Sequence, residues 1–220
     1  MIFLRSLAFN LAFYAVTIVE MIVFPPFYFL ASRKKAWWVP KFWARSNLWL
    51  QKVLAGTESE ITGQENLPEG AYILAPKHQS FWDTFALVPH IPDAVYILKR
   101  ELMWIPVFGW YLGKMNMIPI DRGSPARALR NVVVEARKRA EQGRQIVIYP
   151  EGTRRPPGAE PAYKHGIAEI YSRLGIPVVP VAHMAASSRC GSCRRSRPAC
   201  HGPSSWHVWS MKPRRHAMRC

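Results

Sequence analysis

Residues 71–83 read AYILAPKHQSFWD, and this stretch contains a strand pattern, a loop and the start of a helix. The apolar run 71–75 predicts a buried strand, and a helix is expected from about residue 81 to 89. Further apolar runs at 94–98, 117–120, 145–149 and 177–182 alternate with helical patterns at about 102–113, 125–142 and 165–174. This alternation predicts an α/β domain with a central, mostly parallel mixed sheet flanked by helices.

Residues 1–56 precede this domain and predict a membrane-associated helical hairpin or a single span. The run 6–31 is apolar and longer than the roughly 20 residues that cross a bilayer. Glu20 interrupts it, and the pair Pro25–Pro26 breaks any helix near residue 24. It lacks the small-residue cleavage pattern of a signal peptide, so we expect it to be retained. The alternative is a buried helical pair packed on the domain.

Aromatic and basic residues interleave from 37 to 52, a pattern that suits the headgroup layer of a membrane. The basic triplet 33–35 precedes this stretch. Because cytoplasmic loops carry the excess of Lys and Arg, we expect the triplet and the α/β domain on the cytoplasmic face.

The chain is strongly basic, with a net charge of +16 over 220 residues. Such charge on a soluble protein would suggest a nucleic acid, but 49% hydrophobic residues and nine Trp favour an anionic membrane surface. No nucleic-acid recognition motif is found, so we predict a lipid bilayer and not a nucleic acid as partner.

His78 and Asp83 are the first candidate catalytic residues. His78 falls in the loop after the strand 71–75, where an imidazole can remove a proton from a hydroxyl group. Asp83 can fix the tautomer of that ring, but residues five apart on a regular helix are about 140° out of phase. The two meet only if His78 precedes the helix, so Ser80 is predicted as its N-cap. The alternative role for Asp83 is a capping box with Ser80.

Polar clusters follow three other predicted strands. Their members are Lys99 and Arg100, then Asp121 and Arg122, then Glu151, Gly152, Thr153 and Arg154. Open α/β sheets bind ligands at such strand ends, and an arginine fork can hold a phosphate with two parallel donors. Gly152 allows backbone torsions that other residues resist. Each cluster alone could instead be a charged surface turn.

Taken in order, these motifs resemble the glycerolipid acyltransferase family, and closely its 1-acylglycerol-3-phosphate acyltransferases. The resemblance spans roughly 63–183 and rests on His-x4-Asp at 78–83, Ile-Asp-Arg at 120–122, Pro-Glu-Gly-Thr-Arg at 150–154 and Val-Pro-Val at 179–181. It implies acyl transfer from acyl-CoA or acyl carrier protein to the 2-hydroxyl of lysophosphatidic acid, giving phosphatidic acid. It also implies that no metal or other cofactor is needed.

The resemblance assigns roles residue by residue. His78 and Asp83 would form the catalytic pair, and the final apolar strand would line the acyl pocket. The predicted substrate-binding residues are Lys99, Arg100, Arg122, Glu151, Gly152, Thr153 and Arg154, of which Arg122, Glu151, Gly152 and Arg154 would hold the glycerol phosphate. Rival interpretations are another lysophospholipid or glycerol 3-phosphate as acceptor, or a non-catalytic lipid-binding membrane protein.

The composition changes after His183, so we divide the chain into 1–56, a catalytic domain at 57–183 and a tail at 184–220. The tail has no Leu, Ile, Phe or Tyr, carries +8 of the charge and holds Cys190, Cys193, Cys200 and Cys220. A reading-frame shift would explain this and would remove the last strands of the sheet. The alternatives are a zinc site that includes His201, and a disordered basic tail on anionic lipid.

Overall fold

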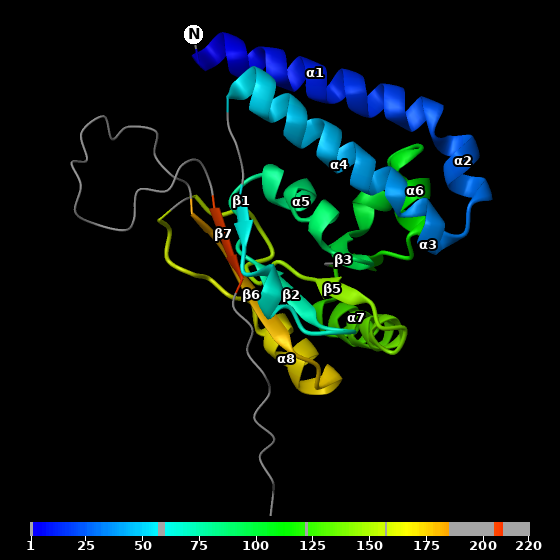
Figure 1. Ribbon diagram of the computed structural model, residues 1–220. Helices are drawn as coiled ribbons and strands as arrows, with labels where there is room; N and C mark the ends of the chain where they lie inside the picture. The colour runs from blue at the N-terminus through cyan, green and yellow to red at the C-terminus, as the bar shows by residue number, and fades with distance from the viewer. Residues whose placement is uncertain (1, 57–59, 122, 157, 185–204, 209–220) are drawn as a thin grey trace, which may run out of the picture.

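The computed structural model describes residues 2–56, 60–121, 123–156, 158–184 and 205–208. Within these ranges a central sheet separates two layers of helices (Figure 1). Arg122 and the four cysteines lie outside the described residues, as does His201.

The sheet has the strand order β1-β7-β6-β2-β5-β3-β4. Its strands are β1 (Glu60–Thr62), β2 (Ile73–Pro76), β3 (Ala94–Lys99), β4 (Ile118–Ile120), β5 (Gln145–Val147), β6 (Val178–Met184) and β7 (Ser205–Val208). Neighbouring strands are parallel except β6 and β7, which are antiparallel. In the register, Ile73 at the centre pairs with Ile146 on one side and Val178 on the other. This mostly parallel mixed sheet confirms the predicted fold class.

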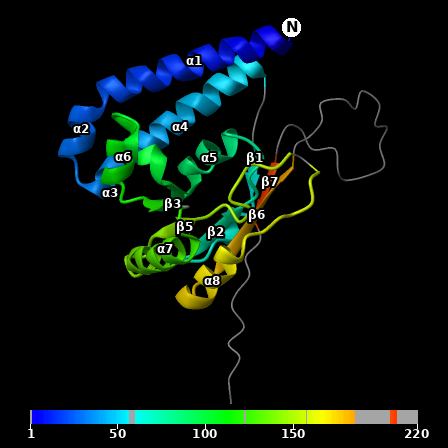
Figure 2. The same cartoon turned by 180° about the vertical axis from the view of Figure 1, so that it is seen from behind.

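Two helices cover one face of the sheet, and the N-terminal helices lie on the other side. Figures 1 and 2 show α7 (Pro125–Ala140) and α8 (His165–Leu174) on the side opposite α1 (Ile2–Val23) and α4 (Trp38–Leu50). Strand side chains alternate between the faces, so Ile73 joins the core under α7 and α8 while Leu74 joins the other core. Both side chains are buried, so β2 is packed on both faces of the sheet.

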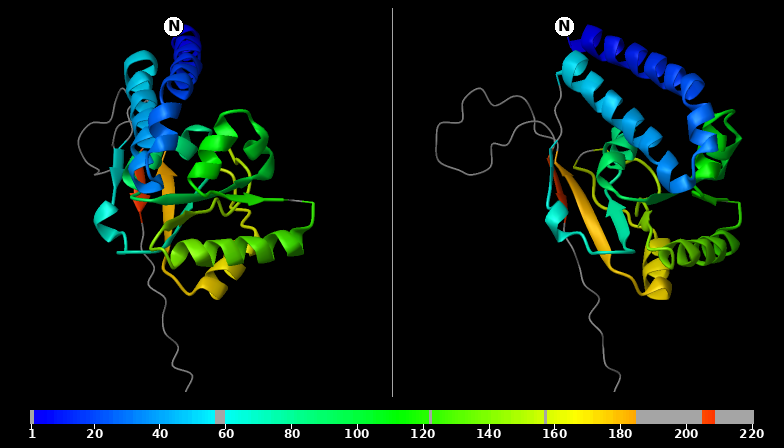
Figure 3. Two further views of the ribbon diagram at one scale, coloured as in Figure 1. Left: turned by 90° about the vertical axis from the view of Figure 1, so that its right-hand side faces the viewer. Right: turned by 45° about the vertical axis from the view of Figure 1, so that its right-hand side comes forward.

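The N-terminal helices are α1, α2 (Pro25–Leu30), α3 (Arg33–Ala36) and α4, followed by the π-helical turn η1 (Gln51–Ala55). Helices α1 and α4 lie side by side in the views of Figures 1 and 3. Residues Phe3–Val23 are long and apolar enough to cross a membrane by length and composition, with mean hydropathy 1.8. Only 11% of this segment is buried, so α1 packs on α4 and leaves most of its apolar surface exposed. The alternative of a buried helical pair packed on the domain holds only in part: Phe13 of α1 packs on Phe85, but most of the apolar surface of α1 is exposed.

An ion-pair network fastens the N-terminal segment to the sheet. Asp93, just before β3, accepts from Arg33 Nη1 at 2.5 Å and from Arg144 Nε at 3.0 Å. Arg144 is 1% exposed and also donates to the backbone carbonyls of Ala94 and Met115. Burial lowers the pKa of Arg144 to about 10, although the neighbouring Asp93 opposes the shift. Asp93 is thus the counter-ion that both arginines share.

Short helical segments connect the remaining strands: η2 (Gln64–Asn66), α5 (Trp82–Ala86), η3 (Val88–His90), η4 (Arg100–Trp104) and α6 (Phe108–Lys114). The single helix predicted at 102–113 is divided into η4 and α6. Pro106 lacks an N–H group, and Val107 has a left-handed φ of 64°. A continuous helix cannot pass through these two residues.

Residues 205–208 differ from the prediction, which put them in a tail without a place in the sheet. They form β7, which pairs parallel with β1 and antiparallel with β6. Strand pairing uses backbone N–H and C=O groups, which every non-proline residue carries. The edges of β1 and β6 therefore offer backbone hydrogen-bond partners to residues 205–208, although this segment has few aliphatic residues.

We predict that Asp93→Ala lowers the free energy of unfolding by about 3 kcal/mol, because it leaves the buried Arg144 without a counter-ion. Denaturant unfolding in detergent measures the loss. The matched control is Glu135→Ala, which removes a surface partner of Lys138 and Arg139 and should cost about 0–1 kcal/mol. Equal losses in the two variants would contradict the role given to Asp93.

Candidate active site

His78 and Asp83 meet at the end of β2. His78 lies in the loop after Pro76, and its side chain is 15% exposed, while that of Asp83 is fully buried. Nδ1 of His78 is 3.4 Å from Oδ2 of Asp83. The loop geometry inferred from the spacing is therefore present, since α5 begins only at Trp82. A separation of 3.4 Å is long for a hydrogen bond, so this contact alone restrains the ring weakly.

The Asp83 carboxylate also organises the loop beside His78. Its Oδ2 accepts from the backbone N–H groups of Gln79 at 2.5 Å and Ser80 at 2.7 Å. The Ser80 hydroxyl donates to Oδ1 at 3.1 Å. Burial opposes ionisation of this carboxyl group, but the bonds from His78, Ser80 and Gln79 outweigh it and hold the Asp83 pKa below its usual value. Asp83 is thus an ionised acceptor at neutral pH.

The prediction of Ser80 as the N-cap is wrong. Phe81 is the N-cap residue, and the Ser80 hydroxyl donates to a carboxylate instead of accepting from a helix N–H. Half of the capping box is nevertheless present, because Asp83 reaches back to the Ser80 N–H. The cap interpretation and the catalytic interpretation of Asp83 therefore describe two bonds of the same side chain.

Tyr149 is a site residue that the sequence reasoning missed. Its ring centroid lies 4.2 Å from that of His78, with the planes tilted by 33°. Its hydroxyl donates to the backbone carbonyl of Asp83 at 2.9 Å. Burial raises the Tyr149 pKa well above its usual value, so the phenol stays a donor. An aromatic residue directly before Pro150 and Glu151 was the available signal, but it was assigned only to the buried strand.

The segment 151–155 follows Tyr149 and is bonded to the His78 loop. The Arg155 N–H donates to the His78 carbonyl at 2.8 Å. Gly152 has φ of 65°, which confirms the need for a permissive residue at this turn. Thr153 and Arg154 are exposed, and Arg154 makes no hydrogen bond or ion pair with any described residue. This leaves an arginine fork open beside the His78 loop.

Glu151 is 1% exposed, and neither of its carboxylate oxygens has a hydrogen-bond partner among the described residues. Burying a carboxylate without a partner is unfavourable. The unused acceptors therefore call for donors from a ligand or from residues outside the described ranges. Arg122, which the family resemblance assigns to the same phosphate site as Glu151, lies outside the described ranges.

Lys99, the last residue of β3, and Arg100, the first residue of η4, form a second cationic group besides Arg154. Both are exposed, and Arg100 Nη1 lies 2.9 Å from Asp121 Oδ2. The Gly123 N–H also donates to Asp121, and this bond together with Arg100 lowers the Asp121 pKa. No described contact joins this group to His78. Because β5 lies between β2 and β3, the two groups share one sheet edge at a separation of about 10 Å.

Comparison with known proteins identifies the family. A model of a family described as acyltransferase matches residues 58–184. The chain belongs to the acyltransferase family. The resemblance seen in the motifs is thereby confirmed, and the matched segment contains His78, Asp83 and both cationic groups.

Acyltransferases of several organisms are similar to this chain. A 1-acyl-sn-glycerol-3-phosphate acyltransferase of Pseudomonas aeruginosa is 37% identical over 156 residues, covering 71% of this chain and 61% of its own length. The chloroplastic LPAT1 of Arabidopsis thaliana is 29% identical over 173 residues, covering 76% and 47%. The chain therefore spans about half to three fifths of these relatives.

A solved acyltransferase structure has the same fold. The crystal structure of the 1-acyl-sn-glycerophosphate acyltransferase PlsC of Thermotoga maritima superimposes with a TM-score of 0.71. The match covers 97% of this chain and 89% of that chain at 21% identity. Coverage this complete includes the N-terminal helices, so the shared fold extends to them.

If the chain carries out the acyl transfer proposed below, we predict that Tyr149→Leu lowers turnover about 100-fold, because a His78 ring displaced by about 1 Å loses its reactive alignment. Tyr149→Phe removes one hydrogen bond, worth about 1 kcal/mol, and should lower turnover about 5-fold. Steady-state kinetics should show these losses in kcat and little change in KM.

The control for these variants is Tyr72→Phe, which removes a buried hydroxyl that has no partner among the described residues. It should keep full turnover. Thermal unfolding of each variant separates a local effect from loss of the fold. Full turnover by a folded Tyr149→Leu protein would contradict the role of this ring.

Proposed function

We propose that this chain transfers a fatty acyl group from acyl-CoA or acyl carrier protein to the 2-hydroxyl of 1-acylglycerol 3-phosphate, giving phosphatidic acid. The observation that carries the proposal is the His78–Asp83 pair next to an open arginine fork, Arg154, on the connected loop. Further support comes from relatives named 1-acyl-sn-glycerol-3-phosphate acyltransferase.

In this mechanism His78 is the general base. Its Nδ1–H donates to Asp83, which leaves the lone pair on Nε2 free to accept the proton of the 2-hydroxyl group. The hydroxyl oxygen attacks the thioester carbonyl carbon, and a tetrahedral intermediate forms. Its collapse breaks the C–S bond, and the leaving thiolate takes the proton from the His78 imidazolium. Neither an acyl-enzyme nor a metal ion takes part in this sequence.

The acceptor phosphate would be held by the arginine forks at the sheet edge. Arg154 and Arg122 supply parallel donors, with Lys99 and Arg100 adding positive charge across the edge. Gly152 and Thr153 shape the turn that presents Arg154. The buried Glu151 would accept from Arg122 or from a glycerol hydroxyl, which satisfies its unused oxygens. The last apolar strand predicted from the sequence, which is β6 in the structure, would line the acyl pocket.

The reaction would take place at a membrane surface. The exposed apolar surface of α1 supports this placement, as does the interleaving of Trp and basic residues along α4. The basic triplet Arg33–Lys34–Lys35 favours the cytoplasmic side. A lipid acceptor and product would then enter and leave through the bilayer.

The test is acyl transfer from a labelled thioester to lysophosphatidic acid, in membranes that carry the chain. We expect His78→Ala to lower turnover at least 100-fold, since general base catalysis contributes about 10²–10⁴-fold. The control is His90→Ala, because His90 lies on η3 and bonds Gln64 instead of the site. We also expect Arg154→Gln to raise KM for lysophosphatidic acid more than it lowers kcat.

Either of two results would overturn the proposal. The first is unchanged turnover in His78→Ala, which would exclude this base. The second is absence of turnover in the native chain while it still binds lysophosphatidic acid vesicles, which would favour a lipid-binding protein. Turnover with glycerol 3-phosphate but not lysophosphatidic acid would correct the acceptor and keep the chemistry.

A further inference from the structure

The catalytic domain carries an exposed apolar edge that acyl transfer does not use. Trp104 on η4 is 68% exposed, Ile105 is 45% exposed, and Trp110 on α6 is 63% exposed. Exposed aromatic residues gathered in one short segment indicate a surface that meets a partner. None of the three belongs to the predicted substrate-binding set.

The backbone of this edge is fixed by a strained turn. The Phe108 N–H donates to the Pro106 carbonyl at 2.7 Å, which places Val107 at the centre of a γ-turn with φ of 64°. Gly109 packs so closely on Met103 that an added Cβ would lie 2.1 Å from the Met103 carbonyl oxygen. These constraints keep Trp104 and Trp110 on the outside of a rigid segment.

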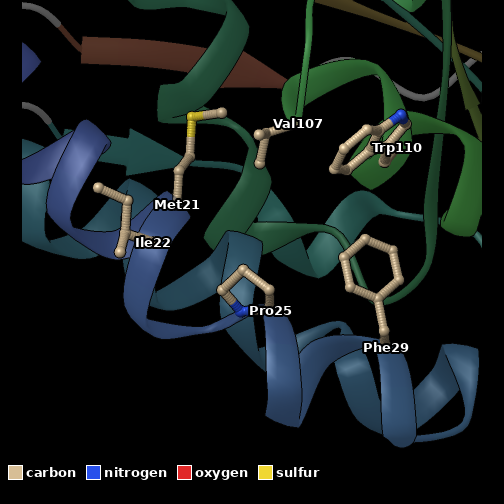
Figure 4. A pocket seen from close by; sticks show the side chains of 6 residues that line it. All are labelled: Met21, Ile22, Pro25, Phe29, Val107 and Trp110. Atoms are coloured by element: carbon tan, nitrogen blue, oxygen red, sulfur yellow. The ribbon is translucent and has the colours of Figure 1, made fainter.

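An apolar groove joins this edge to the N-terminal helices. It has a volume of about 530 Å³ and is lined by Met21, Ile22, Pro25, Phe29, Val107 and Trp110. Figure 4 shows the first four side chains on α1 and α2 and the last two on the α6 side. Ile22, which lines the groove, is itself 72% exposed on α1. The apolar surface of the candidate membrane span therefore continues across the groove onto α6.

Direct bonds hold α6 and α2 together. Lys114 Nζ donates to the carbonyls of Phe29 and Ala31 at 2.9 and 2.8 Å. Tyr28 and Tyr111 stack with centroids 4.2 Å apart, and the Tyr28 hydroxyl donates to the Tyr111 carbonyl. A bilayer that takes up α1 and α2 therefore meets the α6 edge at the same time.

We propose that the η4–α6 edge inserts into the same leaflet as α1 and α2, with an acyl chain of a bilayer lipid in the groove between them. This rests on the membrane association proposed above. Hydrocarbon suits a groove lined by apolar side chains, and indole rings are enriched at membrane interfaces. The guanidinium of Arg100 lies 6.0 Å from the centroid of the exposed Trp104 ring, so this edge also carries a cation that can face headgroups. The catalytic domain is thereby held at the membrane by its own side chains as well as by α1.

The test uses the full chain with its four cysteines changed to serine, so that one cysteine can carry an environment-sensitive nitrobenzoxadiazole label. The test position is Trp110→Cys. Ile18→Cys, at a residue 56% exposed on α1, reports membrane binding itself. The matched control is Val134→Cys, at a residue 53% exposed on α7, which lies on the opposite side of the sheet in Figure 1. Emission is recorded with vesicles of phosphatidylcholine and phosphatidylglycerol.

We expect the emission of the labels at 110 and 18 to shift to the blue, to brighten several-fold and to be quenched by spin-labelled acyl chains, while the label at 134 stays unchanged.

A response at 18 without one at 110 overturns the contact of the η4–α6 edge with the membrane and keeps membrane binding by α1. A silent label at 18 overturns both. If the label at 110 responds to a higher protein concentration without vesicles, the groove binds a second copy of the chain, and the assignment to lipid is overturned. Turnover is no part of this readout, so failure of the proposed chemistry remains distinguishable.

Discussion

The buried carboxylate of Asp83 is the constraint on which the site depends. It accepts from two backbone N–H groups and one hydroxyl of the His78 loop, and it faces the imidazole at 3.4 Å. A charged group without solvent is stable only when donors surround it, so the loop must keep the shape that supplies them. The same requirement sets the position of His78 against Tyr149, whose hydroxyl bonds the Asp83 carbonyl.

The N-terminal helices reach this loop through aromatic packing. Phe13 of α1 lies 5.6 Å from the ring of Phe81 and 5.8 Å from that of Phe85, the residues that flank Asp83 by two on either side. Trp43 of α4 also packs on Phe85. With the Asp93 network at the other end of the helix pair, the N-terminal segment is part of the scaffold of the site. In the proposed function, this scaffold holds His78 at a fixed distance from the membrane surface.

The sequence was sufficient for the parts of the fold that follow local rules. Apolar runs such as 145–149 identified the strands, and their order placed His78, Lys99 and Glu151 at one sheet edge. It could not reveal β7, because a strand that completes a sheet uses backbone groups without a composition signal. Tyr149 was missed for a related reason: its bond to Asp83 joins residues 66 apart, and only the folded chain brings them together. The helix break was partly readable, because Pro106 cannot continue a helix, but the positive φ of Val107 was not.

The proposed mechanism requires His78 in the tautomer with the proton on Nδ1, which faces Asp83, and the lone pair on Nε2. ¹⁵N NMR of histidine-labelled chain in bicelles measures this directly, with His78→Gln used to assign the resonances. At a pH where the imidazole is neutral, we expect a protonated-type Nδ1 shift and an unprotonated-type Nε2 shift. The opposite tautomer, or an average of the two, would show that Asp83 does not orient the base and would contradict the account.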